Sequence, residues 1–163
     1  MKGTNQTMDK KRKIKIHPLL IVGLVILVSG LTVNYRNQTR SILQENLDKS
    51  LQQYNEGTIS EIDFATLTSF PWNRLYIFGP YTSCDTIVKA LKNPTFWPTC
   101  FLETGSFVDE GESFFVFTNH RLVKQYLLSN QGLLFYKRLE GFTIQDARFK
   151  LNENELLVGI NDE

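Results

Sequence analysis

The sequence predicts an α+β fold, with one N-terminal transmembrane helix followed by a small domain that has a mostly antiparallel sheet and two or more helices. Three patterns support this prediction: an uncharged apolar run at 19–33, a helical repeat of apolar residues after it, and an alternating repeat from Thr58 onward. These patterns divide the chain into four parts. We expect a cytoplasmic basic tail (1–13), a transmembrane helix (14–35), a juxtamembrane amphipathic helix (36–57) and an extracytoplasmic α+β domain (58–163).

Charge is distributed unevenly along the 163 residues, although the net charge is only +1. Residues 1–17 contain six basic residues and one acidic residue, so the rest of the chain has 12 basic and 16 acidic residues. A mildly acidic body does not offer the positive surface that neutralising many phosphates requires. We therefore expect no nucleic-acid partner.

The apolar run can cross a bilayer when its flanks are included. A helix over residues 14–35 would be roughly 33 Å long, against a hydrocarbon core of about 30 Å. Basic residues stay on the cytoplasmic side, so the pattern predicts a single-pass signal-anchor in the inner (cytoplasmic) membrane, with the C-terminal domain extracytoplasmic. The lipid bilayer would then be a partner through residues 14–35. A cleaved signal peptide is the alternative, although no A-x-A site follows the run.

A second helix is predicted from Asn37 to Tyr54. Leu43, Leu47, Leu51 and Tyr54 recur at spacings of four, four and three, and Gly57 suits a left-handed cap after the last turn. The apolar stripe could form a dimerising coiled coil or could pack on its own domain. Two heptads are too few to sustain a coiled coil, which favours packing on the domain.

Strands and a short helix come next. Alternation predicts strands at 62–66 and 74–78, and Thr82 with Asp85 forms a capping-box pattern that opens a helix. That helix should end near Asn93 and Pro94, because proline cannot continue a helix.

The C-terminal half is predicted to be rich in strands. Residues 94–112 contain prolines, glycines and scattered aromatic residues, which indicates an irregular segment. A hairpin should follow, with a turn around Asn119 and His120. Further strands are expected at 133–139, 148–151 and 156–160. The order of elements predicts a sheet whose helices lie on one face.

The segment F-P-W-N-R-L-Y-I-F-G-P-Y-T, residues 70–82, carries a family resemblance. It resembles the segment F-x-W-D-x-x-Y-x-F-x-P-Y-T of small uncharacterised bacterial membrane-anchored proteins and lipoproteins, in which a later V-F hairpin also occurs. Phe115–Phe117 would correspond to that hairpin, and the similarity covers about residues 62–149. Asn73 replaces the usual Asp, and no lipidated Cys follows the apolar run. The resemblance implies a bacterial envelope protein and implies no activity.

Aromatic residues in this segment are candidates for a binding surface. Trp72, Tyr76 and Tyr81 could form a platform for a ligand or peptide, because Tyr and Trp give rigid, amphipathic contact area. They could instead fill the core. Alternation places Tyr76 and Phe78 on one face of the strand and Leu75 on the other, which favours the core.

Cys84 and Cys100 are the two cysteines of the chain. Outside the cytosol such a pair indicates a disulfide, which would tie the irregular segment to the body of the domain. The alternative is a nucleophilic Cys84 thiol at a helix N-terminus with His120 as its base.

Other chemistry has little support in the sequence. His120 lies in a turn, and the loop containing Asp109, Glu110 and Glu112 lacks the regular oxygen spacing of a calcium site. The usual phosphate, dinucleotide, serine-hydrolase and metalloprotease motifs do not occur. We therefore expect no catalytic residues, no metal and no cofactor.

These observations predict a binding or interaction domain that is anchored in the membrane of a bacterial envelope and is not an enzyme. Its expected partner is another envelope protein. One alternative is a membrane-tethered inhibitor or immunity protein. Another is an envelope hydrolase with an unrecognised site.

Overall fold

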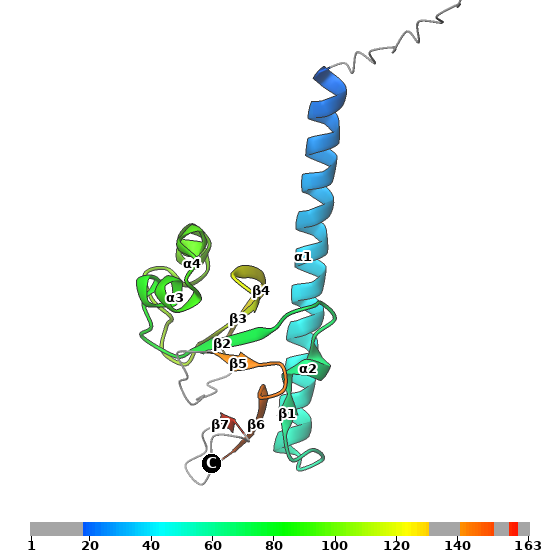
Figure 1. The fold of residues 1–163 in the computed structure, drawn as a ribbon. Helices are drawn as coiled ribbons and strands as arrows, with labels where there is room; N and C mark the ends of the chain where they lie inside the picture. The colour runs from blue at the N-terminus through cyan, green and yellow to red at the C-terminus, as the bar shows by residue number, and fades with distance from the viewer. Residues whose placement is uncertain (1–17, 131–140, 152–156, 160–163) are drawn as a thin grey trace, which may run out of the picture. The chain divides into compact units, whose positions relative to one another are not determined.

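The computed structural model describes residues 18–130, 141–151 and 157–159 (Figure 1). Its helices are α1 (Pro18–Asn55), α2 (Phe64–Leu67), α3 (Cys84–Leu91) and α4 (Trp97–Thr104), with a 3-10 turn η1 (Pro94–Phe96). Its strands are β1 (Ile62–Asp63), β2 (Arg74–Phe78), β3 (Ser113–Asn119), β4 (Leu122–Ser129), β5 (Phe142–Thr143), β6 (Arg148–Leu151) and β7 (Leu157–Gly159). The expected α+β class with antiparallel sheets is confirmed.

Two compact units make up the chain, residues 1–35 and 36–163. In the first unit, the described part of α1 exposes its large apolar side chains all round. Each of them is 49–67% exposed: Ile21, Val22, Leu24, Val25, Ile26, Leu27, Val28, Leu31, Val33 and Tyr35.

Among the residues that the structure describes, no helix combines the length and the apolar character that crossing a membrane requires. The predicted span begins at Ile14, and residues 14–17 lie outside the described ranges. The transmembrane helix therefore stays a prediction.

In the second unit, the C-terminal part of α1 belongs to the core of the domain. Leu43, Leu47 and Leu51 are 0–4% exposed, and Tyr54 packs against the same buried cluster. The helix ends at Asn55, and Gly57 follows with a φ of +71°. The expectation that the leucine stripe packs on its own domain is confirmed.

The larger sheet has the strand order β4-β3-β2-β5 and forms the middle layer of the domain. β2 and β3 pair from Arg74 opposite Thr118 to Phe78 opposite Phe114. All but the first residue of β2 and all but the last residue of β3 are buried. Such continuous burial is typical of strands that are covered on both faces.

Helices cover both faces of this sheet, so the prediction that they lie on one face is wrong. One face, with Leu75 and Phe115, shares a core cluster with the leucine stripe of α1. The other face, with Tyr76 and Phe114, shares a second cluster with α3, η1 and α4. Two alternating sets of apolar residues on β2 and β3 make this arrangement possible.

The strand predicted at 62–66 is short, because a helical turn interrupts it. β1 ends at Asp63, whose carboxylate accepts a hydrogen bond from the Ala65 backbone N–H at 2.9 Å and thereby caps α2. Thr66 Oγ1 donates to the Asp63 carbonyl. Local bonds of Asp and Thr to the backbone compete effectively with strand pairing.

Helix α3 begins one residue later than predicted. Ser83, rather than Thr82, is the N-cap, and its Oγ accepts from the Thr86 N–H. Thr82 donates instead to the Gly79 carbonyl at 2.8 Å. The helix ends at Leu91, and Lys92 adopts the left-handed conformation that closes it, which agrees with the predicted stop.

The segment predicted to be irregular contains η1 and α4. Its two prolines occupy first-turn positions, where the missing N–H would have no partner within the helix in any case. Cys100 and Thr104 turn toward the core from α4. The prediction of an irregular segment is therefore wrong for residues 94–104, because its prolines begin helical turns.

The C-terminal strands agree in part with the prediction. β6 and β7 confirm the strands at 148–151 and 156–160, whereas the predicted strand at 133–139 lies outside the described residues. The short β5 was not predicted. Gly141 precedes it with a φ of +72°, and a Cβ atom there would lie 3.0 Å from the Leu75 carbonyl oxygen. Glycine thus permits β5 to approach β2.

Trp72 is predicted to be essential to the stability of this fold. Its side chain is 5% exposed, its indole N–H donates to Thr68 Oγ1 at 2.7 Å, and its ring meets Phe117 edge to face. We expect Trp72→Ala to lower the free energy of unfolding by about 3 to 5 kcal/mol, the usual loss for a buried large aromatic. Urea unfolding of the full chain in detergent, followed by circular dichroism, measures this loss.

The exposed Trp97 supplies the matched control for this substitution. Because its side chain is 42% exposed, Trp97→Ala should cost at most about 1 kcal/mol. Equal unfolding midpoints for the two variants would contradict the structural role of Trp72.

Candidate functional site

The three aromatic residues predicted as a binding platform do not meet at the surface. Trp72 is buried in the core cluster under α1, and Tyr76 is buried in the cluster under α3 and α4. Tyr81 is 66% exposed and has a positive φ of 63°. The platform is therefore not formed, because Trp72 and Tyr76 are buried in separate core clusters and Tyr81 alone of the three is exposed.

The Cys84–Cys100 disulfide is confirmed, with a Cα–Cα distance of 5.8 Å. It joins the first residue of α3 to the middle of α4. The two cysteines are 16 residues apart in the sequence. By the chain-entropy model, a disulfide that closes a loop of this length contributes roughly 3 kcal/mol to stability. Because the Cys84 sulfur is bonded, the alternative of a Cys84 nucleophile with His120 as its base is wrong for this structure.

His120 lies at the tip of the β3–β4 hairpin with a φ of +55°. Its backbone N–H donates to Asn73 Oδ1 at 3.0 Å, and the Asn73 N–H donates to the Thr118 carbonyl at 2.8 Å. Asn73 thus fixes the hairpin turn to the start of β2.

The acidic loop forms a local turn. The Asp109 N–H donates to Glu112 Oε2 at 3.3 Å, and both residues lie close to Gly111, which has a positive φ of 80°. In the described ranges, no group of three or more His, Cys, Asp or Glu residues could hold a metal ion.

A basic groove is the site that sequence reasoning missed. Its volume is about 450 Å³, and it lies where the end of α3 meets β2 and the hairpin turn. Its lining residues are Arg74, Tyr76, Lys89, Ala90, Leu91, Lys92, His120 and Arg121. They include four cationic residues and a histidine, and none is acidic.

Backbone geometry holds the two sides of this groove together. Lys92, with a φ of +52°, donates its N–H to the Lys89 carbonyl and ends α3. Asn93 Nδ2 donates to the Arg121 carbonyl at 3.1 Å, which ties the end of α3 to the hairpin turn. Two of the groove residues, Lys92 and His120, therefore adopt left-handed conformations that are uncommon without glycine and that often occur at functional sites.

Three of the four cations of this groove, Lys89, Lys92 and Arg121, are available to a ligand. Within the part of the chain that the structure describes, Lys89, Lys92 and Arg121 form no ion pair, and all three are exposed. Lys89 also lies in the last turn of α3, where a positive charge suits the helix dipole. Clustered cations with no acidic neighbour in the lining give a positive potential that attracts anions.

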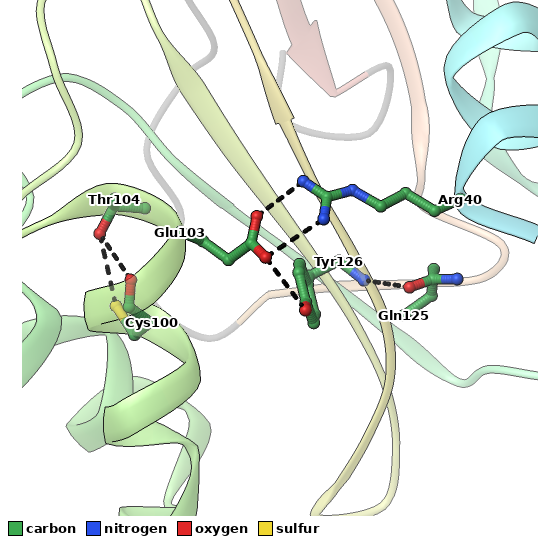
Figure 2. Close-up of polar contacts among 6 residues, drawn as sticks. All are labelled: Arg40, Cys100, Glu103, Thr104, Gln125 and Tyr126. Carbon is green, nitrogen blue, oxygen red and sulfur yellow. Dashed lines mark hydrogen bonds and ion pairs between the residues drawn. The ribbon is translucent and has the colours of Figure 1, made fainter. Parts of the chain in front are cut away.

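A second polar cluster joins α1, α4 and β4 (Figure 2). Arg40 makes a bidentate pair with Glu103, with Nη2 lying 2.7 Å from Oε2 and Nη1 lying 3.2 Å from Oε1. The guanidinium carbon also lies 5.1 Å from the centre of the Tyr126 ring, and the Tyr126 hydroxyl donates to Glu103 at 3.2 Å. A partly buried bidentate pair with these additional contacts orients its partners better than an isolated surface pair does.

Gln125 extends this cluster toward the start of the second unit. Its Nε2 donates to the Arg36 carbonyl at 2.8 Å and to Thr39 Oγ1 at 2.6 Å, and the side chain is 3% exposed. On α4, Thr104 Oγ1 donates to the Cys100 carbonyl at 3.1 Å. The cluster thus fastens residues 36–40 to β4 and α4, which is a structural role.

Burial raises the pKa of the Tyr126 phenol, and the nearby Glu103 carboxylate raises it further. Arg40 acts in the opposite direction and has a smaller effect than these two causes. The phenol is therefore a hydrogen-bond donor at neutral pH and a poor general base there.

The chain matches no family model, no curated protein and no solved structure. The basic groove therefore has to be interpreted from its own residues.

The raised pKa of Tyr126 predicts a loss of stability in alkali. The neutral phenol stabilises the folded state, because its pKa is higher in the folded chain than the ordinary value of 10.0. This contribution to the free energy of unfolding is fully present below pH 10.0 and is lost as the pH rises above that value. We expect the free energy of unfolding to decrease less between pH 8 and pH 11 in Tyr126→Phe than in the wild type, measured by urea unfolding. The exposed Tyr81 supplies the control, because Tyr81→Phe should keep the wild-type decrease. Identical decreases in the wild type and Tyr126→Phe would refute this assignment.

Proposed function

We propose that the protein is a membrane-anchored binding domain of a bacterial envelope, which holds an acidic segment of a partner envelope protein in the basic groove. The single observation that carries the binding role is the groove itself. Four cationic residues from separate parts of the chain gather there, although the chain after residue 17 is acidic overall.

The anchor is supported by the sequence of residues 1–35. A cluster of basic residues precedes a long uncharged run, which is the order expected of a signal-anchor whose following domain is extracytoplasmic. The disulfide suits this location, because disulfides persist outside the cytosol. The resemblance of residues 70–82 to segments of bacterial membrane-anchored proteins points in the same direction.

The lining of the groove suits a peptide. Besides the basic residues, the lining of the groove includes Tyr76, Ala90 and Leu91. An acidic peptide can pair with the cations while its backbone and aliphatic atoms contact these apolar residues. Attraction of this kind falls as the ionic strength rises. The inhibitor and hydrolase alternatives stay predictions.

A charge-matched pair of double variants tests the groove. The full chain in carbonate-washed membranes is titrated with a fluorescent peptide of alternating aspartate and glycine. Lys89→Gln with Arg121→Gln removes two groove cations, so we expect the peptide affinity to fall by about tenfold or more, at roughly 1 kcal/mol for each contact. Binding to the wild type should weaken steadily with added salt.

The control variant is Lys49→Gln with Lys124→Gln, which removes the same charge from exposed positions outside the groove. It should bind the peptide as the wild type does. An equal loss in both double variants would show a general charge effect and would overturn the groove as the site. Binding of inorganic phosphate without binding of the peptide would overturn the peptide ligand, and release of the chain by carbonate would overturn the anchor.

A further inference from the structure

His120 is the one histidine of the described residues, and it lies in the lining of the basic groove. The other histidine of the chain, His17, lies outside the described ranges. Histidine is the side chain whose charge ordinarily changes between about pH 5 and pH 8, whereas lysine and arginine stay positive there. The charge of the groove can therefore depend on pH through His120.

The backbone of His120 fixes its place at the edge of the groove. The residue has a φ of +55°, and its N–H donates to Asn73 Oδ1 at 3.0 Å. In the described ranges, its imidazole forms no hydrogen bond and no ion pair, and the residue is exposed. The imidazole is thus free to contact a ligand. Because the bond to Asn73 uses the backbone N–H, it does not depend on the charge of the ring.

The charged groups that line the groove together with His120 are all cations. They are Arg74 on β2, Lys89 and Lys92 at the end of α3, and Arg121 in the hairpin turn. Tyr76 on β2 is the remaining titratable residue of the described lining. A carboxylate that pairs with the imidazolium inside the groove therefore has to come from a ligand.

We propose that protonation of His120 strengthens the binding of the acidic segment, so that the groove holds its partner more tightly in mildly acidic surroundings. This inference rests on the proposed function. A carboxylate attracts an imidazolium more strongly than it attracts a neutral imidazole. By linkage, a ligand that prefers the protonated form causes the imidazole to take up a proton from water on binding, and the affinity rises as the pH falls.

Peptide titrations at two pH values test this proposal. The full chain in carbonate-washed membranes is titrated with the fluorescent aspartate–glycine peptide at about pH 7.5 and about pH 5.5, at constant ionic strength. The peptide keeps its charge, because the ordinary pKa of aspartate is about 3.9. We expect the wild type to bind about fivefold more tightly at the lower pH, which is the effect of one exposed charge contact.

Two histidine variants make the comparison specific. His120→Asn removes the titrating ring, and asparagine tolerates the left-handed backbone of this turn. This variant should bind the peptide about as tightly as the wild type at the higher pH and should gain nothing at the lower pH. His17→Asn removes the other histidine and should keep the wild-type gain.

The outcomes separate this inference from the proposed function. An equal wild-type affinity at the two pH values, with the peptide bound at both, would overturn the role of His120 and leave the groove as the site. A gain that persists in His120→Asn would assign the effect to another group and would also overturn it. Absence of peptide binding at both pH values would refute the proposed function and this inference with it.

Discussion

The packing of the α1 leucine stripe against the larger sheet is the interaction on which the rest of the domain depends. Leu43, Leu47 and Leu51 are almost completely buried and share one cluster with residues of β2 and β3, with Ile62 of β1 and with Phe149 of β6. Without this helix, one apolar face of the sheet would meet water. Burying such side chains is worth about 1.5 to 3 kcal/mol each, so the stripe is a large part of a stability of the order of 5 to 15 kcal/mol.

Polar bonds and one disulfide then give this packing a fixed geometry. The pair of Arg40 with Glu103 and the bonds of Gln125 fasten the start of the second unit to β4 and α4, while the disulfide fastens α4 to α3. Helix α3 in turn supplies one side of the basic groove. The disulfide and these polar bonds thus fix the position of the helix that lines the cationic groove.

Much of the fold could be predicted from the sequence, because its strongest elements have clear periods. The leucine stripe, β2 and the β3–β4 hairpin follow clear repeats, and the disulfide was expected because the chain has two cysteines in a domain predicted to lie outside the cytosol. Two predictions of secondary structure were wrong. At Asp63, local hydrogen bonds end the predicted strand and begin α2, and in α4, proline begins a helix in a segment that was expected to be irregular. The groove could not be predicted from the sequence, because its basic residues lie at positions 74, 89, 92 and 121, which come together only in the folded chain.

Native-state hydrogen exchange of the full chain in detergent measures most directly whether α1 belongs to the core. If the leucine stripe holds the domain together, the amides of residues 43–51 should exchange through the same global unfolding as those of β3. Both sets should then show the same opening free energy and the same dependence on low concentrations of urea. Exchange of residues 43–51 through a separate local opening, while β3 stays protected, would contradict this account.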